Sequence, residues 1–430
     1  MNLINFMIFV HCRIKPWWAL NVLEALIQKE IRSWQTIDAI FTMYSDRDYL
    51  EVINYKWWVI SWWWDNLELK TQNLKLPIIT ALPRWLNTLF RRADDTKPRG
   101  ISSIIDYRNL MPLFPELMEV LSWKLRNFTP KKPHPRSFSW QRRMTTRTRA
   151  PLWEERGWGE VCISSYAVAK NIKIPAGRHS TIYFHQPMHY IWTLYDAYVW
   201  SMRGRKKKLY ELITPRLRRR DAKPRSYDTI YANSESTKKQ IKKIYFPLLS
   251  PQIEVIHPPI AEAFFHESVV TKPDNYFFYI NRLTKLFKHL DRIILLCNKY
   301  KVPLIIAGDG PDKAYLQSIA WPTITFVWWV SNIEDKIALI KKSRWVLNIA
   351  HESFGIVTAE ALLLWVPVFG YEGGATPELV DTKSGILTPS VEVDQMSPYF
   401  EQFLMKEWDR QVIQDHARKL LTKKQEFWKI

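Results

Sequence analysis

Two glutamates eight residues apart are the side chains whose types and spacing best suit chemistry. Glu352 follows a short apolar run, and Glu360 lies within the helical pattern that begins just after it. The backbone of residues 354–356 is expected to present N–H groups at the start of that helix, a natural site for an anion or a hydroxyl group. A carboxylate one or two turns into the helix can accept hydrogen bonds from ribose hydroxyls. The glycine pair 373–374 supplies a second loop where backbone can approach a ligand closely.

The elements that must position these residues alternate short β-rich runs with helical patterns. Strands are predicted at Tyr276–Ile280, Leu304–Ala307, Ile324–Val327, Val346–Ile349 and Val366–Phe369. Helices are predicted between them at Leu290–Tyr300, Glu334–Lys342 and Val357–Leu364. This alternation indicates βαβ units and a parallel, doubly wound α/β sheet. Ligands of such sheets bind at the carboxyl ends of the strands, so the functional residues are expected in the loops that follow them.

The N-terminal half begins in the same way and then becomes harder to interpret. We predict strands at Ile4–Val10, Val161–Ser165 and Thr181–Phe184, and a helix over Leu20–Ile31. Residues 131–158 are basic, contain proline and are poor in aliphatic side chains, so we expect an exposed insertion there. Prolines near residues 258–273 indicate a hinge. The predicted organisation is therefore an N-terminal domain at 1–265, a C-terminal domain at 270–395 and a closing helix at 396–430.

Residues 351–380 resemble the E-x(7)-E signature of the retaining family-4 glycosyltransferases of GT-B fold. The resemblance lies in the whole stretch HESFGIVTAEALLLWVPVFGYEGGATPELV, which carries more information than two spaced glutamates. It implies two Rossmann-like domains that face each other across a cleft. The C-terminal domain would bind a nucleotide-sugar donor, and the N-terminal domain would bind the acceptor. In that family no separate cofactor is needed, because the nucleotide-sugar is a substrate.

The resemblance assigns roles to the residues of this segment. Glu360 would bind the ribose of the donor. Glu352 would face the donor sugar as a catalytic residue. Backbone groups would contact the donor sugar and phosphate at Phe354, Gly355 and Ile356.

Two further loops of the C-terminal half resemble donor-binding elements of the same family. In INRLTKLFKHLD, Arg282 and Lys288 would neutralise the donor diphosphate. The family's usual spacing is one residue shorter, which leaves Lys285 as an alternative to Lys288. The loop that contacts the base would include Gly308, Trp328 and Val330.

The N-terminal half contributes one catalytic candidate. The stretch YFHQPMHYIW resembles an H-x-P-x-R-Y-x-W element of mannosyltransferase-like members, in which His185 would reach the donor sugar. This chain has His189 where an arginine is more usual. The run Ile230–Ser234 resembles the family's strand end with the letters ANS.

Composition and charge exclude several other classes of protein. The 430 residues carry a net charge of +20, 47% are hydrophobic, and three cysteines are too few for a disulfide framework. We find no metal-ligand constellation, no D-x-D strand end and no apolar run of about 18 residues. We expect a cytoplasmic protein. Basic runs at 205–208 and 216–220, with the apolar pattern at 110–125, leave peripheral contact with the inner face of the plasma membrane and plain solubility open. Nucleic acid is not an expected partner.

Glycine and tryptophan counts are unusual in opposite directions. The chain has 12 glycines, where about 7% of residues is ordinary, and 22 tryptophans. Trp17 and Trp18 replace a Gly-Gly phosphate and acceptor loop of the family, and Trp365 replaces the glycine before VPV. Trp34 and Trp345 also fall where a turn is predicted. We therefore hypothesise that many of these tryptophans are glycines encoded by UGA, a codon that some bacteria read as glycine.

The sequence as a whole predicts an enzyme. It predicts metal-independent, retaining transfer of a hexose to a saccharide or lipid-linked acceptor in cell-surface glycan synthesis. GDP-mannose is the first donor expected and a UDP-sugar the second. The alternatives are a GT-B nucleotide-sugar epimerase, which would make a new nucleotide-sugar without an acceptor, and a binding relative that does not recognise a donor.

Overall fold

The computed structural model describes residues 6–14, 25–27, 29, 36–45, 49–58, 69–80, 114–126, 160–166, 168–223, 225–269, 272–327, 330 and 332–429. The chain divides into two compact units. The first comprises residues 1–184, 219–231 and 430, and the second comprises residues 185–218 and 232–429. The predicted insertion at 131–158 lies outside the described residues, as do Trp17, Trp18, Trp34 and Trp328. The domain boundaries stated above stay predictions.

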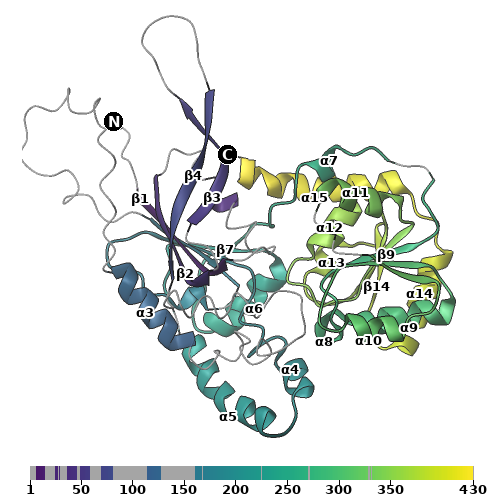
Figure 1. Ribbon diagram of the computed structural model, residues 1–430, viewed down its shortest axis with the longest axis horizontal. Helices are drawn as coiled ribbons and strands as arrows, with labels where there is room; N and C mark the ends of the chain where they lie inside the picture. Colours follow the sequence, from purple (N-terminus) through teal and green to yellow (C-terminus); the bar gives the residue numbers. More distant parts are fainter. Residues whose placement is uncertain are drawn as a thin grey trace, which may run out of the picture. The chain divides into compact units, whose positions relative to one another are not determined.

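The first sheet has eight strands in the order β3-β4-β2-β1-β5-β6-β7-β8 (Figure 1). Its strands are β1 (Phe6–Ile14), β2 (Thr36–Ser45), β3 (Tyr49–Trp58), β4 (Leu69–Thr80), β5 (Glu160–Ser165), β6 (Ser180–Phe184), β7 (Thr229–Ala232) and β8 (Glu254–Val255). Strand β1 pairs in parallel with β2 and β5, whereas β3 and β4 form an antiparallel pair. The helices α3 (Phe114–Arg126) and η5 (Ala169–Asn171, 3-10) belong to the same unit. Of the helix predicted at Leu20–Ile31, residues 25–27 and 29 are described, and they are helical.

The second sheet is parallel in every described strand pair and is doubly wound. It comprises β9 (Phe277–Ile280), β10 (Leu304–Ala307), β11 (Ile324–Val327), β12 (Trp345–Asn348), β13 (Val368–Tyr371) and β14 (Gly385–Thr388). The spatial order is β11-β10-β9-β12-β13-β14, so the chain first winds outward from β9 in one direction and then restarts at β12 on its other side. This reversal between β9 and β12 is the topological switch point where ligands of such sheets bind.

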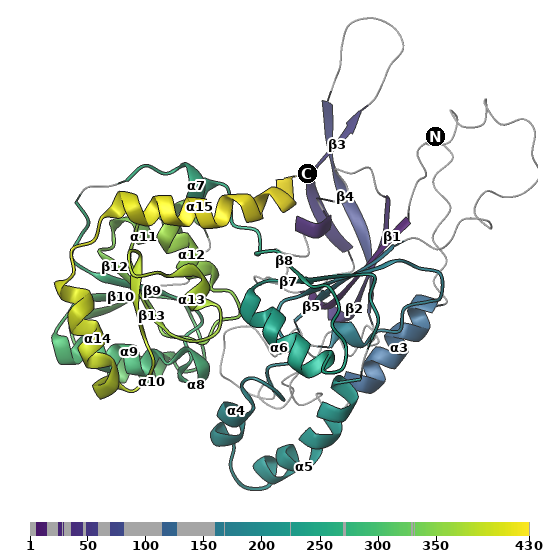
Figure 2. The same cartoon turned by 180° about the vertical axis from the view of Figure 1, so that it is seen from behind.

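Helices cover both faces of the second sheet (Figures 1 and 2). They are α7 (Ala263–His266), α8 (Lys285–Lys288), α9 (Leu290–Tyr300), α10 (Lys313–Ser318), α11 (Ile333–Lys342), α12 (Ile356–Leu363), α13 (Thr376–Leu379), α14 (Val393–Met405) and α15 (Arg410–Lys429). The second unit also contains α4 (Tyr195–Ser201), α6 (Glu235–Tyr245) and all but the last turn of α5 (Gly204–Asp221).

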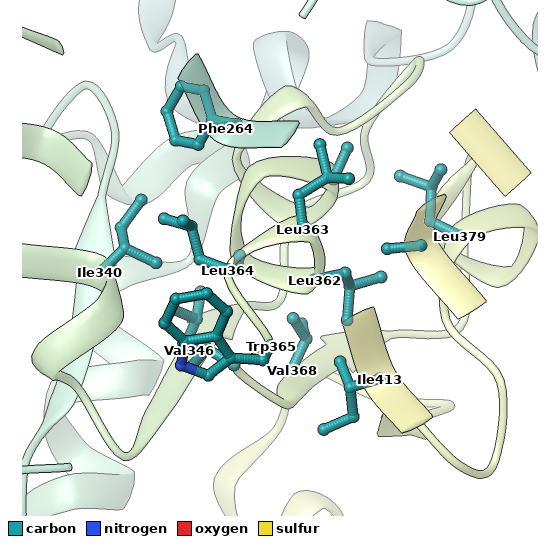
Figure 3. Packing of buried hydrophobic residues seen from close by; sticks show 14 of the residues in the cluster. Phe264, Ile340, Val346, Leu362, Leu363, Leu364, Trp365, Val368, Leu379 and Ile413 are labelled. Atoms are coloured by element: carbon teal, nitrogen blue, oxygen red, sulfur yellow. The ribbon is translucent and has the colours of Figure 1, made fainter. Parts of the chain in front are cut away.

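Alternate side chains of β9 enter two separate cores. Phe277 and Tyr279 pack with residues of α9, α10 and α14. Phe278 and Ile280 pack on the opposite face with residues of α7, α11, α12 and α15, part of which is seen in Figure 3. Because both faces are covered, the strands are short, continuous apolar runs without a polar face. The parallel, doubly wound sheet predicted for this half of the chain is thus confirmed.

Two predicted elements of this half differ from the structure by more than one residue. The strand predicted at Val366–Phe369 begins at residue 368, because Val366 takes part in closing the preceding helix. The closing helix predicted at 396–430 is two helices, α14 and α15, since the chain leaves helical geometry at Lys406 and re-enters it at Arg410. Trp345 is the first residue of β12 and does not lie in a turn. Its ring stacks on Phe277 with a centroid separation of 4.5 Å.

Trp365 closes helix α12 in a conformation that favours glycine. Its φ is +56°, its amide donates to the carbonyl of Leu362, and the amide of Val366 donates to the carbonyl of Ala361, each at 2.9 Å. These two bonds define a Schellman motif with Trp365 at C′, where glycine is usual because it has no Cβ. The indole is fully buried in the core of Figure 3, and its Nε1 has no hydrogen-bond partner.

The same motif ends α9 with a different residue at C′. Lys301 has φ +53° and donates to Asn298, while Val302 donates to Cys297. A left-handed lysine here shows that a positive φ alone does not demand glycine. Trp365 differs because its large indole ring, with its N–H group, is buried, whereas the side chain of Lys301 is exposed. An unpaired buried N–H adds a desolvation cost to the strain of the left-handed backbone.

We therefore predict a reversal of the usual alanine-over-glycine preference at this position. The variants Trp365→Gly and Trp365→Ala both remove the indole, but only glycine relieves the left-handed backbone. The glycine variant should be the more stable of the two by about 1 kcal/mol in denaturant unfolding. Lys301→Gly and Lys301→Ala form the matched control and should show the same order. An alanine variant at 365 equal to or more stable than the glycine variant would contradict this.

Candidate functional site

Loops of the second unit follow β9, β10, β12 and β13 at the carboxyl ends of its parallel strands, and these loops and the helices after them carry most of the predicted donor-site residues that the structure describes. Asn281 and Arg282 follow β9, Gly308 follows β10, and Glu352 follows β12. The strand order makes the loops after β9 and β12 neighbours at the switch point.

An ion pair joins the loops on the two sides of the switch point. Lys288 Nζ lies 2.6 Å from Glu352 Oε1, and Asn281 Nδ2 lies 3.5 Å from the same oxygen. Both charged side chains are mostly buried, with exposed fractions of 14% for Lys288 and 19% for Glu352. Lys285, the alternative cation, is instead exposed, with its Nζ 4.5 Å from the centre of the Tyr315 ring. The structure thus brings Lys288, and not Lys285, to the glutamate.

Backbone contacts at glycines fix these loops. A Cβ added at Gly308, whose φ is +144°, would meet the carbonyl oxygen of Asn281. A Cβ at Gly374, whose φ is +65°, would meet the carbonyl oxygen of Glu352. The amide of Ala375 donates to that same carbonyl at 2.9 Å, and Glu352 and Gly374 form a β-bridge. Glycine is needed at both positions because neighbouring backbone occupies the space of a side chain.

Glu360 lies on α12 and is paired with a lysine that sequence reasoning missed. Its side chain is 8% exposed, and Lys336 Nζ of α11 forms an ion pair with its Oε2. Burial raises the pKa of Glu360, and the nearby charge of Lys336 opposes that effect. The ammonium group of Lys336 also lies 5.7 Å from the centre of the Phe264 ring.

The start of α12 presents backbone between the two glutamates. Gly355 is its N-cap with φ +95°, and the helix begins at Ile356. The N–H groups of the first helical turn have no acceptor within the helix, so they are available to an anion. Phe354 is buried, and its ring centre lies 4.9 Å from that of His257. Its side chain therefore anchors the loop, while the backbone is the part that can face a ligand.

The remaining predicted donor residues lie in the loops after β9, β10 and β11. Arg282 is exposed, and its backbone amide donates to Asn281 Oδ1 at 2.9 Å. Val330, in the predicted base loop, is half-buried, while Trp328 of the same loop lies outside the described residues. Gly310 packs closely on the backbone of Leu283, which ties the loop after β10 to the one after β9.

His185 lies in the same unit as the donor loops and is fully buried. Thr237 Oγ1 lies 3.4 Å from its carbonyl oxygen and 3.4 Å from the carbonyl oxygen of Ser353, which follows Glu352. The histidine backbone and the glutamate loop thus share one hydroxyl group. His189 makes hydrogen bonds through its ring at 2.9 Å to Gln186 and at 3.3 Å to the Tyr198 hydroxyl, so it is held within this segment.

The strand end with the letters ANS also reaches the glutamate loop. Ser234 Oγ donates to the carbonyl of Ser353 at 2.6 Å and caps α6 by accepting from the amide of Thr237 at 3.0 Å. Glu378 of α13 accepts from the amides of Glu235 and Ser236 at 2.8 and 2.6 Å. The start of α6 is therefore bonded to the loop that carries Glu352 and to helix α13. A negative carboxylate at a helix N-terminus is also favoured by the helix dipole.

Among the residues that the structure describes, no group of three or more histidine, cysteine or acidic side chains could hold a metal ion. The positive charges near the donor loops come from lysines, arginine and helix N–H groups.

Three residues of this site were absent from the sequence-based set. Asn281 could have been found, because it is the first residue after a predicted strand end. Lys336 and Ser353 could not, since their roles arise from contacts between elements whose spacing along the chain carries no signal.

Comparison with known proteins gives this geometry a context. Residues 261–420 match a family model described as Glycosyl transferases group 1. A curated relative, the GDP-mannose-dependent alpha-mannosyltransferase of Mycobacterium tuberculosis (strain CDC 1551 / Oshkosh), is 34% identical over 124 residues. That match spans 29% of this chain and 32% of the relative, so it covers about one third of the relative's length.

Solved structures resemble the chain over nearly its whole length. WaaG, a glycosyltransferase involved in lipopolysaccharide biosynthesis, is 12% identical with a TM-score of 0.55 over 98% of each chain. Anabaena HepE in complex with UDP is 12% identical with a TM-score of 0.53, covering 98% of this chain and 97% of its own. The apo structure of OtsA is 10% identical with a TM-score of 0.53 and the same coverage. At these identities the likeness shows the fold, and the predicted GT-B fold is confirmed.

Proposed function

We propose that this chain is a retaining, metal-independent hexosyltransferase of glycosyltransferase family 4 that uses a nucleoside diphosphate sugar. The observation that carries the proposal is the meeting of Lys288, Asn281 and Glu352 at the switch point of the second sheet. A cation paired with a carboxylate beside free helix N–H groups suits a diphosphate with a sugar attached. The glycosyltransferase group 1 domain at residues 261–420 supports the same reading.

In the proposed reaction the leaving diphosphate gains negative charge as the bond to the sugar breaks. Arg282, Lys288 and the N–H groups at the start of α12 would stabilise that charge, since preorganised donors act most strongly on charge that develops in the transition state. Glu352 would face the sugar, and Glu360 would accept hydrogen bonds from the ribose. The proton of the acceptor hydroxyl would pass to the donor phosphate. His185 would contact the sugar.

The proposal also includes the identity of the donor and the class of acceptor. GDP-mannose is our first donor, because the curated relative is named a GDP-mannose-dependent alpha-mannosyltransferase. A UDP-sugar is the second, because HepE was crystallised with UDP. The acceptor would be a saccharide or a lipid-linked saccharide of the cell surface. An epimerase or a binding relative would differ in its products, since only a transferase moves the sugar to an added acceptor.

The two lysines after β9 provide a matched test of donor binding. Lys288→Gln should raise the Kd for GDP or UDP by roughly 10-fold or more, because it removes a charged donor from the diphosphate. Lys285→Gln should change it by less than about twofold. Titration calorimetry on the full chain, as printed and with glycine at positions 17, 18 and 365, makes the measurement. An equal loss of nucleotide affinity in both variants would contradict the assignment of Lys288 to the diphosphate. No nucleotide binding by either parent protein would overturn the proposed function.

The glycine hypothesis is part of this proposal. Trp17 and Trp18 would block a phosphate loop, and Trp365 occupies a left-handed helix end with a buried, unpaired indole nitrogen. We propose that these three positions are glycines encoded by UGA. The codons decide the matter: UGA at all three is expected, and UGG at any of them would remove that position from the proposal.

A membrane surface is the remaining part of the proposal. Helices α4 and α5 expose three large apolar side chains, Trp200, Leu209 and Leu212, at 87%, 57% and 77%. Exposed cations surround them: Arg203, Arg205, Lys206, Lys208 and Arg216. Along α5, the spacing of Arg205, Leu209, Leu212 and Arg216 places them on one stripe of the helix. Apolar side chains flanked by cations suit the surface of an anionic bilayer.

Two findings limit how this region could contact a membrane. Arg218, part of the basic run in the sequence, points inward, since its Nε donates to the carbonyl of Ile191 at 2.6 Å. No described helix is both long and apolar enough to cross a bilayer. The predicted apolar segment 110–125 includes all of α3 except its last residue, and Val120 and Trp123 of this helix are exposed.

Vesicle co-sedimentation tests the surface on α5. The full chain should bind vesicles of phosphatidylcholine with phosphatidylglycerol and lose binding as salt is added. The double variant Leu209→Gln/Leu212→Gln should bind roughly 10-fold more weakly, because two exposed apolar side chains no longer enter the bilayer. Leu248→Gln/Leu249→Gln, exposed leucines that follow α6, is the control and should bind normally. Equal binding to pure phosphatidylcholine would contradict the role of charge.

A further inference from the structure

Helix α11 delivers one cation to the buried carboxylate of Glu360. Lys336 lies in the first half of the helix, and its Nζ pairs with Glu360 Oε2. The lysine side chain is 20% exposed, so its charge is itself largely removed from water. The Phe264 ring of α7 lies beside the same ammonium group. The pair is therefore enclosed by three helices, α7, α11 and α12.

The charge of Glu360 depends on this lysine. Burial favours the neutral acid and raises its pKa, and Lys336 is the charged group that works in the opposite direction. Three other titratable groups on helices around α12 are engaged elsewhere. Glu378 of α13 binds the start of α6, His416 of α15 lies 3.3 Å from Asp381, and His266 of α7 lies 3.5 Å from Glu262. Removing Lys336 would leave a buried carboxylate without its counter-charge.

The protonation state of a carboxyl group decides what it can recognise. An ionised carboxylate accepts hydrogen bonds at both oxygens, whereas a protonated one gives up part of that capacity to its own O–H. Ribose hydroxyls donate stronger hydrogen bonds to an ionised carboxylate than to a neutral acid, because the acceptor then carries a negative charge. Glu360 in its neutral form would therefore bind a ribose less well.

We infer that Lys336 is a positioning residue for nucleoside binding, which holds the Glu360 carboxylate ionised and oriented so that it can accept from the ribose hydroxyls. This inference rests on the proposed function, because it takes Glu360 as the ribose-binding residue. Lys336 acts through Glu360 and need not touch the ligand. It makes recognition of the ribose, and not of the diphosphate, depend on a residue of α11.

A comparison of GDP with 2′-deoxy-GDP separates this role from a merely structural one. In the parent protein, loss of the 2′-hydroxyl should weaken binding roughly 10-fold, because a hydrogen bond to a charged group is lost. In Lys336→Met the two nucleotides should bind with nearly equal affinity, because a neutral Glu360 gains little from the 2′-hydroxyl. Lys336→Arg should restore the difference, because it keeps the charge. A structural role would weaken both nucleotides alike and preserve their ratio.

The pH dependence gives a second readout of the same variants. Without Lys336 the pKa of Glu360 rises further, so the carboxylate forms only as the pH increases. Discrimination between GDP and 2′-deoxy-GDP in Lys336→Met should therefore grow as the pH is raised, toward that of the parent at the same pH. Lys336→Gln replaces the methionine variant if circular dichroism shows that the latter is unfolded.

The outcomes separate the two proposals. Retained discrimination at neutral pH in a folded Lys336→Met or Lys336→Gln variant overturns the role of Lys336 and leaves the proposed function intact. Failure of the parent to bind either nucleotide, both as printed and with glycine at positions 17, 18 and 365, overturns both. Binding without discrimination in the parent overturns the role of Glu360 and, with it, that of Lys336.

Discussion

Contact between backbone and backbone at glycine positions is the constraint on which the candidate site depends. The loop after β10 touches the backbone after β9 at Gly308 and Gly310, and the loop after β13 touches that of Glu352 at Gly374. Atoms of the main chain cannot yield as a flexible side chain can, so these loops have little freedom to move apart or to accept a larger residue. The side chains of Asn281 and Glu352 are attached to these segments of backbone, so their positions are restricted as well.

Much of the second unit could be predicted from the sequence, because strong local signals coincide there. Helix α9 matches its predicted bounds, Leu290–Tyr300, since an amphipathic pattern ends where the chain turns left-handed. Strands β10 and β11 match as well, because four-residue apolar runs between helices have few alternatives. The placement of Glu352 followed from a general rule about strand ends in parallel sheets, and did not require knowledge of packing.

Other features could not be predicted, for reasons that are physical. The start of β13 was misplaced by two residues because Val366, which is apolar and β-branched, serves the closure of α12. Lys336 looked like any solvated lysine of an amphipathic helix, and only the packing of α11 on α12 gives it a buried partner. Trp345 was assigned to the turn before the predicted strand Val346–Ile349, yet it is the first residue of β12 and its ring lies against Phe277. Predictions at Trp17 and Trp18 fall outside the described residues.

The crossover from β12 to β13 has a consequence for how the site assembles. It contains both Glu352 and Glu360, whereas Lys288 and Lys336 belong to earlier crossovers of the same sheet. The two glutamates are therefore close to each other in the sequence. Each lysine pairs with its glutamate only after a longer stretch of chain has closed into a loop. A chain in which this single crossover has formed ahead of the others holds two carboxylates without counter-ions. The site's charge balance is a property of the completed sheet, and it is acquired late, when the non-local contacts form.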